Sequence, residues 1–225
     1  MDFESLAMVI SVIKMSQIKL ISFDAEGTVV TPAFSHAMWH ETIPALYAEK
    51  EGIDIVQAKE AVVEEYDKIG DQRLEWYDID YWTEGLGLGA SGPVIQSCLN
   101  KIFYYPEVID VLSSLGNKYQ LVIASGTPVE LLDFLLQDIK PYFARVFSSV
   151  SHYGQLKNPE FYLGICKEMG VKPDQVVHVG DNWQYDFLNS RQIGINAFYL
   201  DRSGTNHQES LSDLAQLKQL FLPSA

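Results

Sequence analysis

Five short apolar stretches recur along the chain, each bounded by polar residues in the manner of a buried strand. They cover residues 17–23, 119–124, 145–148, 175–179 and 196–200. Helical patterns of apolar residues separate the last four, over about 128–138, 159–169 and 183–191. Strands that alternate with helices favour a parallel sheet with right-handed crossovers. We therefore predict an α/β core with a Rossmann-like, doubly wound parallel sheet.

The segment between the first and second of these strands breaks the alternation. It shows no good strand pattern, but four helical stretches cover about residues 35–50, 55–69, 77–86 and 91–102. Ser91 is a suitable N-cap for the last of them, with Pro93 in its first turn. We predict an N-terminal extension over residues 1–16, an α/β core over residues 17–29 and 104–225, and an inserted helical cap over residues 30–103.

The overall charge limits the partners of the protein. The 225 residues carry a formal net charge of −14, and the sequence pI is about 4.6. Such a field repels nucleic acid and anionic membrane surfaces, and we expect neither as a partner. The apolar stretch at residues 6–13 is too short to span a bilayer. A phosphate-binding site in this protein would need local cations of its own, from a metal or a well-placed lysine.

The two cysteines, Cys98 and Cys166, lie far apart in the chain and form no metal-binding spacing. We expect both in the core of a reduced, cytoplasmic protein. The sequence leaves a monomer and a homodimer equally open.

Carboxylates follow the first predicted strand. Asp24 comes directly after it, Glu26 lies two residues further on, and Gly27 permits a tight turn. Ligands of open parallel sheets bind outside the carboxyl ends of the strands. Because alternate strand positions point the same way, we expect the two carboxylates to converge on one site.

Further polar residues follow the later strands, at the same edge of the sheet. They are Ser125 and Gly126 after the second strand, Lys157 after the third, and Asp181 with Asp186 after the fourth. This set suits phosphoryl transfer, in which a carboxylate can act as nucleophile and a lysine neutralises charge. Mg²⁺ prefers one or two carboxylates together with water and phosphate oxygens. The sequence therefore predicts a magnesium-dependent site acting on a small phosphorylated metabolite.

The four motifs, in this order, resemble the haloacid-dehalogenase-like hydrolase superfamily. The pattern of that superfamily is a strand with D-x-D-G-T, a strand ending in Ser or Thr, a Lys, and then G-D followed by a further Asp. The resemblance covers residues 17–29 and 104–200, and the helical insertion lies where the superfamily places one type of cap. It implies that Asp24 is the nucleophile, Glu26 the general acid/base, and Lys157 the charge-neutralising lysine.

The resemblance also implies binding roles. Ser125 and the N–H of Gly126 would bind phosphate. Asp24, the backbone carbonyl of Glu26, and Asp181 would ligate Mg²⁺, and Asp186 would orient water or the lysine. A plainer alternative for the segment 125–127 is a strand-to-helix turn in which Thr127 caps the helix before Pro128, and the two interpretations are compatible.

Glu26 departs from the usual Asp at the second acidic position. Dehalogenases of the superfamily tend to have Tyr there, whereas the enolase-phosphatase branch resembles this chain in having D-x-E-G-T. Glu can do the same proton transfer, although its extra methylene moves the carboxyl by on the order of 1 Å, which can matter for rate. We therefore expect a phosphatase. A phosphomutase, a dehalogenase and a non-catalytic relative that binds a phospho-ligand remain alternatives.

Aromatic residues are frequent in the predicted cap. They are Trp39, His40, Trp76, Tyr77, Tyr81 and Trp82. We expect most of them to pack the cap helices and one or two to line a substrate pocket. His178 is expected to be a strand residue and not a ligand.

Overall fold

The computed structural model describes residues 15–204 and 210–223 of the chain. The predicted N-terminal extension therefore lies almost wholly outside the described residues. The chain divides into two compact units. One contains the residues up to Val30 and from Tyr104 onward, and the other is Thr31–Phe103. We call them the α/β unit and the helical unit, and each is described by itself.

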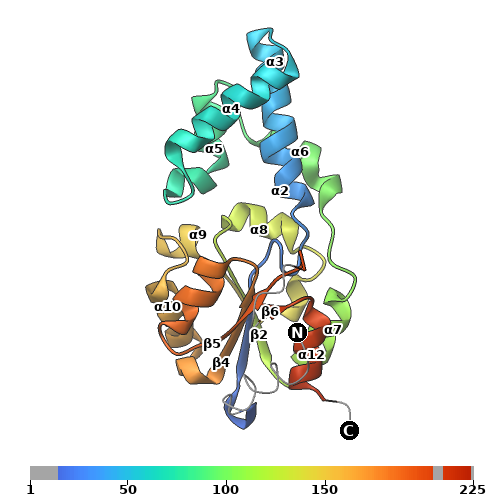
Figure 1. The fold of residues 1–225 in the computed structure, drawn as a ribbon, viewed down its shortest axis with the longest axis vertical. Helices are drawn as coiled ribbons and strands as arrows, with labels where there is room; N and C mark the ends of the chain where they lie inside the picture. The colour runs from blue at the N-terminus through green and yellow to red at the C-terminus, as the bar shows by residue number, and fades with distance from the viewer. Residues whose placement is uncertain (1–14, 205–209, 224–225) are drawn as a thin grey trace. The chain divides into compact units, whose positions relative to one another are not determined.

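A six-stranded parallel sheet forms the centre of the α/β unit (Figure 1). Its strands are β1 (Leu20–Phe23), β2 (Gln120–Ser125), β3 (Arg145–Ser148), β4 (Val176–Gly180), β5 (Asn196–Leu200) and β6 (Ser210–Leu211). The strand order is β3-β2-β1-β4-β5-β6, and every neighbouring pair is parallel. The predicted doubly wound fold is confirmed, although the sequence patterns missed the two-residue strand β6. β1 begins three residues later than predicted, because residues 15–17 form a short 3₁₀ turn, η1 (Met15–Gln17).

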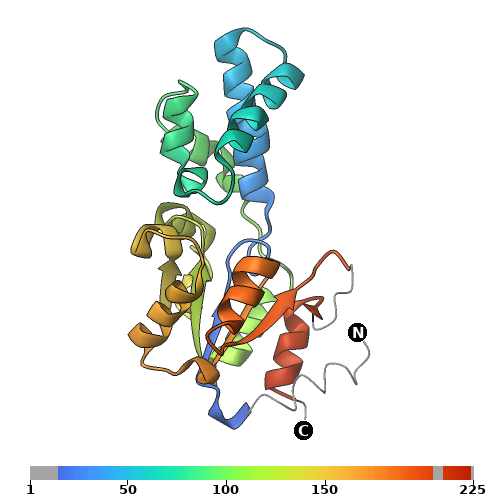
Figure 2. The ribbon, with the colours of Figure 1, turned by 60° about the vertical axis from the view of Figure 1, so that its left-hand side comes forward.

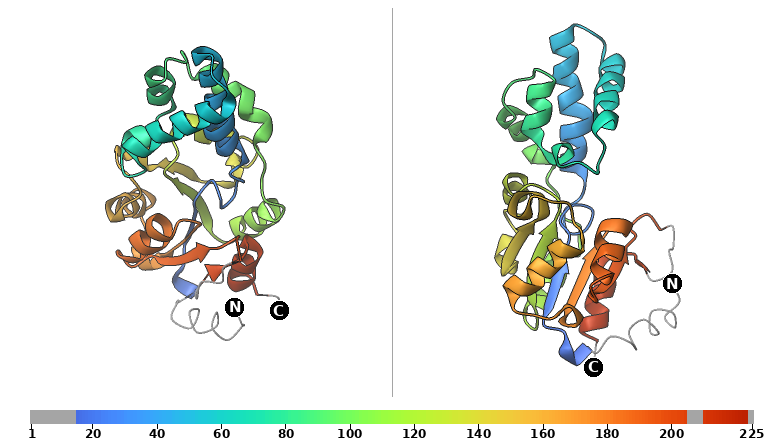
Figure 3. Two further views of the ribbon diagram at one scale, coloured as in Figure 1. Left: turned by 45° about the horizontal axis from the view of Figure 1, so that its top comes forward. Right: turned by 90° about the vertical axis from the view of Figure 1, so that its left-hand side faces the viewer.

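Helices cover both faces of this sheet (Figures 1 and 2). They are α7 (Val108–Gly116), α8 (Val129–Leu135), η5 (Lys140–Tyr142), α9 (Ser149–Tyr153), α10 (Pro159–Met169), η6 (Pro173–Gln175), η7 (Trp183–Leu188), α11 (Asn189–Arg191) and α12 (Leu214–Phe221). α7 and α12 lie side by side on one face, and α10 lies on the other (Figure 3). Phe161 and Ile165 of α10 share a buried apolar cluster with Leu20 and Val122 of the central strands. Burial of such side chains is the main stabilising contribution to the layered core.

The direction of strand addition reverses between β1 and β4. From β1 the chain adds β2 and then β3 on one side, and β4 returns to the other side of β1. The carboxyl ends of β1 and β4 therefore flank the point at which open α/β sheets bind their ligands. In-register pairing of Phe23 with Val179 brings the residues that follow these two strands close together.

The helical unit is formed by α2 (Ala33–Ala37), η2 (Met38–Thr42), α3 (Ile43–Glu51), α4 (Ile55–Ile69), η3 (Leu74–Tyr77), α5 (Ile79–Gly85), α6 (Gly92–Cys98) and η4 (Leu99–Lys101). α3 and α4 pack against each other, and the Asp54 side chain caps α4 by accepting hydrogen bonds from the N–H groups of Val56 and Gln57. Ser91 occupies the N-cap position of α6, as predicted, but its hydroxyl makes no capping hydrogen bond. Among the described residues, no helix combines the length and apolar character needed to cross a membrane.

The chain leaves and re-enters the α/β unit at neighbouring positions. Val30 and Tyr104 form an isolated antiparallel bridge within that unit. On the other side of the boundary, the N–H of Thr31 donates to the carbonyl oxygen of Phe103 at 2.8 Å. The segment 31–103 is therefore a single insertion whose two ends are hydrogen-bonded together.

Candidate active site

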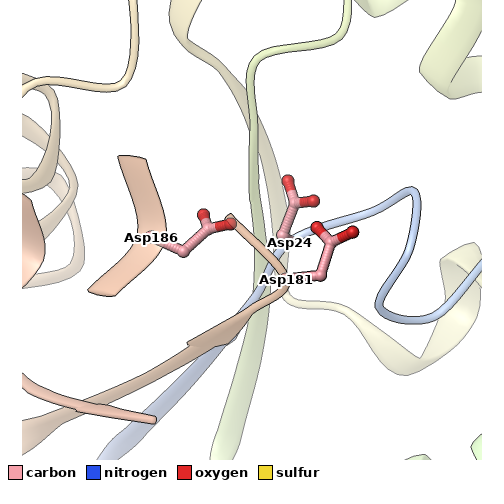
Figure 4. A group of neighbouring side chains, drawn as sticks. All are labelled: Asp24, Asp181 and Asp186. Atoms are coloured by element: carbon pink, nitrogen blue, oxygen red, sulfur yellow. The ribbon is translucent and has the colours of Figure 1, made fainter. Parts of the chain in front are cut away.

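Three carboxylates gather at the carboxyl ends of the two central strands. Asp24 follows β1 directly, Asp181 follows β4 directly, and Asp186 comes from η7. One carboxylate oxygen from each lies within 4.8 Å of the others (Figure 4). The Asp24 N–H donates to the Val179 carbonyl oxygen at 2.9 Å, so the hydrogen bonding of the sheet itself fixes the base of this side chain.

Two of these carboxylates occupy space that is available only because the neighbouring residues are glycines without a side chain. Gly27 has φ +74°, and a Cβ built there would lie 1.9 Å from Oδ2 of Asp181. A Cβ on Gly180 would lie 2.2 Å from Cγ of Asp186. Neither distance is physically possible, so any larger residue at either position would displace a carboxylate.

Lys157 connects Asp24 with Asp186. Its side chain is only 6% exposed, and its Nζ lies 2.8 Å from Oδ1 of Asp24 and also forms an ion pair with Oδ1 of Asp186. The Lys157 carbonyl oxygen accepts a hydrogen bond from Nδ2 of Asn189 at 2.8 Å. Asn158 follows and caps α10 through a 2.9 Å hydrogen bond from the Phe161 N–H. The lysine is therefore held at both its backbone and its ammonium group.

The charges of this cluster are strongly interdependent. Burial opposes the charge of Lys157, but the carboxylates of Asp186 and Asp24 outweigh it and raise the lysine pKa well above its usual value. Asp186 is also buried, yet Lys157 and His178 hold its pKa below the ordinary range. Burial raises the pKa of Asp24, partly offset by Lys157. Asp181 is the exposed member of the three, yet partial burial of its carboxyl group and the charges of Asp24 and Asp186 raise its pKa above the ordinary value. The cluster holds more negative charge than Lys157 alone neutralises.

A buried network of hydrogen bonds holds the Asp186 side chain in position. His178 on β4 is completely buried, with Nε2 at 3.0 Å from Oδ1 of Asp186 and Nδ1 at 3.0 Å from the hydroxyl of Ser22 on β1. The hydroxyl of Tyr162 on α10 lies 3.1 Å from the same Nε2 and donates to the Tyr185 carbonyl oxygen at 3.0 Å. With a hydrogen on Nε2 and none on Nδ1, the ring would donate to Asp186 and accept from Ser22.

Sequence reasoning missed this supporting role. His178 does lie within a strand, as predicted, but it also contacts a site carboxylate. The available signal was a histidine between two valines of a strand expected to be fully buried, since a buried imidazole needs hydrogen-bond partners. Ser22, in register with His178 on the adjacent strand, is one of those partners.

Ser125 and Gly126 lie at the end of β2, next to β1. The Ser125 side chain is buried, and its hydroxyl accepts a hydrogen bond from the Thr127 N–H at 3.2 Å. The predicted capping role of Thr127 is wrong, because Pro128 occupies the N-cap position of α8. The Thr127 carbonyl oxygen instead accepts a hydrogen bond from the Ser148 hydroxyl at 2.8 Å, which anchors the turn to the end of β3.

Glu26 lies in the turn that follows Asp24. β1 ends at Phe23, and the N–H groups of Val29 and Val30 both donate to the Ala25 carbonyl oxygen at 2.9 Å. The strand alternation from which convergence of Asp24 and Glu26 was inferred therefore does not extend to Glu26. Its side chain is half-buried in this turn. The three-carboxylate cluster is formed by Asp24, Asp181 and Asp186.

The donor set fits a hard divalent cation such as Mg²⁺. Oδ1 of Asp186 faces Lys157 and His178, and its Oδ2 accepts from the Asn182 N–H at 3.0 Å. Both oxygens of Asp186 are therefore engaged, which leaves Asp24 as a carboxylate for the cation. Together with Asp181 this gives the one or two carboxylates that Mg²⁺ takes in proteins.

Comparison with known proteins bears on this geometry. A family model described as haloacid dehalogenase-like hydrolase matches residues 18–188. The chain belongs to this family. It is 30% identical over 173 residues to the GMP/IMP nucleotidase YrfG of Escherichia coli K12. The matched region covers 76% of this chain and 77% of that protein. It is 27% identical over 112 residues to a glyceraldehyde 3-phosphate phosphatase of Methanopyrus kandleri, 48% of each chain.

Solved structures of haloacid dehalogenase-like hydrolases share the fold. A HAD phosphatase from Thermococcus onnurineus has a TM-score of 0.78 at 22% identity, covering 91% of this chain and 98% of that one. An L-2-haloacid dehalogenase from Xanthobacter autotrophicus has a TM-score of 0.63 at 17% identity, with 92% and 100% covered. At these identities the likeness concerns the fold, so the reaction has to be argued from the site.

Proposed function

We propose that this hydrolase is a magnesium-dependent phosphatase of small phosphorylated metabolites. One observation carries the proposal: Asp24 stands at the sheet edge beside Asp181, with one oxygen held by a buried, charged lysine at 2.8 Å. That pairing leaves Oδ2 of Asp24 to attack, while Lys157 places a positive charge where the transferred group gains negative charge.

The reaction proceeds in two displacements at phosphorus. Oδ2 of Asp24 attacks the phosphorus atom, the bond to the substrate alcohol breaks, and Glu26 gives its proton to the departing oxygen. Glu26 then removes a proton from water, whose oxygen attacks the same phosphorus and releases inorganic phosphate from Asp24. Ser125 and the Gly126 N–H bind the non-bridging oxygens, and Asp186 keeps Lys157 directed at Asp24.

Mg²⁺ would be held by Asp24, Asp181 and the Glu26 carbonyl oxygen, and when bound it supplies positive charge that neutralises the phosphate and the carboxylates. The proposal draws on the three clustered carboxylates, whose negative charge Lys157 neutralises only in part.

The decisive experiment measures phosphate release from a panel of phosphate esters, with and without Mg²⁺. We expect release that requires Mg²⁺ and that Asp24→Asn abolishes, whereas the control Asp138→Asn, at an exposed aspartate, leaves it intact. Undiminished release by a clean preparation of Asp24→Asn would overturn the proposal. Halide release from a 2-haloacid would indicate a dehalogenase, and sugar-phosphate interconversion without phosphate release would indicate a mutase. Ligand binding without turnover would indicate a non-catalytic relative.

A nucleoside monophosphate is the candidate substrate class that the relatives favour. The nucleotidase relative matches three quarters of both chains, whereas the glyceraldehyde 3-phosphate phosphatase matches about half. We expect kcat/KM for GMP or IMP to exceed that for glyceraldehyde 3-phosphate. A higher kcat/KM for glyceraldehyde 3-phosphate would contradict a nucleoside monophosphate as the substrate. It would not contradict the proposal of a phosphatase.

A further inference from the structure

The guanidinium group of Arg202 lies against the turn that follows Asp24. Arg202 comes two residues after the end of β5, beyond residues 18–188 that the family model matches. Its Nε donates to the Gly27 carbonyl oxygen at 3.2 Å, and its Nη2 donates to the Thr28 carbonyl oxygen at 2.8 Å. Because these two residues directly follow Glu26, Arg202 holds the main chain next to the proposed acid/base residue.

The hydrogen bonds that close the turn use other groups than these two carbonyl oxygens. The Gly27 N–H donates to the Val30 carbonyl oxygen at 2.8 Å, and the Val30 N–H donates to the Ala25 carbonyl oxygen at 2.9 Å. Gly27 and Thr28 are both buried, and buried carbonyl groups need a hydrogen-bond partner. Arg202 supplies it for both, through charge-assisted hydrogen bonds, which are stronger than neutral ones.

The guanidinium group is itself held by residues outside the turn. Its Nη2 donates to Oε1 of Glu107 at 2.7 Å, and the two side chains are each 18% exposed. Its Cζ lies 3.5 Å from the ring centroid of Tyr105, which adds a cation–π contact. The same Oε1 of Glu107 accepts from the Leu214 N–H at the start of α12, at 3.4 Å. The position of the arginine therefore does not depend on the turn alone.

The turn also lies directly beside a site carboxylate. A Cβ on Gly27 would lie 1.9 Å from Oδ2 of Asp181, so the main chain passes close to that group. Glu26 immediately precedes this point, and its side chain is half-buried in the turn. A shift of the main chain at Gly27 would therefore move Glu26 as well, and a displacement of about 1 Å can cost about 10²-fold in rate.

We propose that Arg202 is a positioning residue of the active site, which holds the turn that carries Glu26 and so sets the position from which Glu26 exchanges protons. Arginine suits this task because its planar fork presents several donors in a fixed geometry, whereas lysine carries a single ammonium group. The inference deepens the proposed function and rests on it for the role of Glu26. The hold on the turn does not rest on that function.

The dependence of the rate on the leaving group tests this role. p-Nitrophenol is a stronger acid than an alcohol, so its departure needs little protonation by Glu26, whereas the alcohol of an alkyl phosphate needs it. For the alkyl phosphate of the panel that is hydrolysed fastest, Arg202→Gln should lower kcat/KM by about 10- to 100-fold. The loss for p-nitrophenyl phosphate should be much smaller, and Glu26→Gln should show the same pattern. Equal losses on both esters, or no loss, would overturn the inference.

Two variants serve as controls for charge and for general stability. Arg145 also pairs with a glutamate, Glu168, and lies 5.0 Å from the ring centroid of Phe147, but it begins β3 at the opposite edge of the sheet. Arg145→Gln should therefore leave both esters unaffected. Arg202→Lys keeps a positive charge beside Glu107 without the fork, and should regain only part of the lost activity. Full activity in the lysine variant would refute the role of the two carbonyl contacts.

Two further measurements separate positioning from a loss of stability. The double variant Glu26→Gln/Arg202→Gln should have the same kcat/KM for the alkyl ester as Glu26→Gln alone, because Arg202 acts through Glu26. Losses that multiply would contradict this. Amide hydrogen exchange over residues 25–30 should be faster in Arg202→Gln and Arg202→Lys than in Arg145→Gln. Unchanged exchange would show that Arg202 does not hold the turn.

The outcomes distinguish this inference from the proposed function. If Asp24→Asn still released phosphate while the turn exchanged faster in the Arg202 variants, the proposed function would fail and the hold on the turn would stand. If Asp24→Asn abolished release while Arg202→Gln hydrolysed the alkyl ester as fast as the parent protein, the positioning role would fail and the proposed function would stand.

Discussion

The two units of the molecule place their functional groups in opposite ways. In the α/β unit, the charged side chains of Asp24, Lys157 and Asp186 are buried, and Lys157 is held between the two carboxylates. In the helical unit, aromatic rings from several helices line a partly open cavity, and two of them donate neutral hydrogen bonds to backbone carbonyl oxygens. The difference indicates that the carboxylate cluster depends on electrostatic balance, whereas the packing of the aromatic rings depends on shape. The units should therefore respond very differently to small substitutions.

The largest effect is expected from Lys157→Met. The substitution leaves the carboxylates of Asp24 and Asp186 buried without their cation, and breaking a buried ion pair in this way costs about 3–5 kcal/mol. Phosphate release should fall by about 10²- to 10³-fold or more. Urea unfolding and a phosphate assay measure the two effects. The matched control is Lys167→Met, at an exposed position of α10, the helix that follows Lys157, and equal stability of the two variants would contradict the prediction.

Gly180→Ala should come next and should act mainly on activity. The new Cβ would overlap Asp186, and a displacement of about 1 Å in a catalytic arrangement can cost about 10²-fold in rate. Gly116→Ala is the control, because a Cβ there would lie 3.7 Å from its nearest neighbour, at ordinary contact distance. Steady-state rates that are the same in both variants would show that Asp186 can move without consequence.

His178→Leu should produce a smaller loss, of stability above all. It removes hydrogen-bond partners from the buried groups of Ser22 and Asp186, and each buried group left unsatisfied costs about 1–3 kcal/mol. Ser22→Ala alone should cost less, since only one hydrogen bond is lost. The double variant should be less destabilised than the sum of the two single variants, because both remove the same contact. Strict additivity of the unfolding free energies would argue against the network.

The smallest effect is expected in the helical unit from Tyr66→Phe. The ring remains, and only the hydrogen bond to the Trp39 carbonyl oxygen is lost, which is worth about 1 kcal/mol. Hydrolysis of acetyl phosphate should be unchanged, and the exposed Tyr81→Phe serves as the control for stability. A large loss of hydrolysis in Tyr66→Phe would remove the contrast between the units.

The residues that follow strands could be predicted from the sequence because strand ends are set by local patterns. Asp24 and Asp181 each follow a short apolar stretch directly, and parallel pairing of β1 with β4 brings these two ends together, whereas α9 separates Lys157 from the end of β3. Glu26 shows where this reasoning stops: the chain turns after Asp24, and the alternation of a strand no longer applies. The proton-transfer role of Glu26 stays a prediction.

Contacts between distant segments could not be predicted in the same way. The partners of His178 come from three other elements, so they depend on the packing of α10 and η7 against the sheet. The predicted helix over residues 35–50 is instead α2, the π-helical turn η2 and α3, and that turn carries Trp39 and His40. A single extra residue per turn redirects the side chains that follow, and periodicity alone does not indicate it.

The hydrogen-bonded ends of the insertion have a consequence for how such enzymes diversify. Val30 and Tyr104 pair within the α/β unit, and Thr31 and Phe103 pair beyond it. The whole segment can therefore be exchanged as one cassette, that is, as a single inserted unit, while the strand order of the sheet stays the same. Lengthening a closed loop costs little entropy, so cassettes of different size are tolerated. Recombination at these two positions could therefore join the same reactive carboxylates to a different helical unit in a single event.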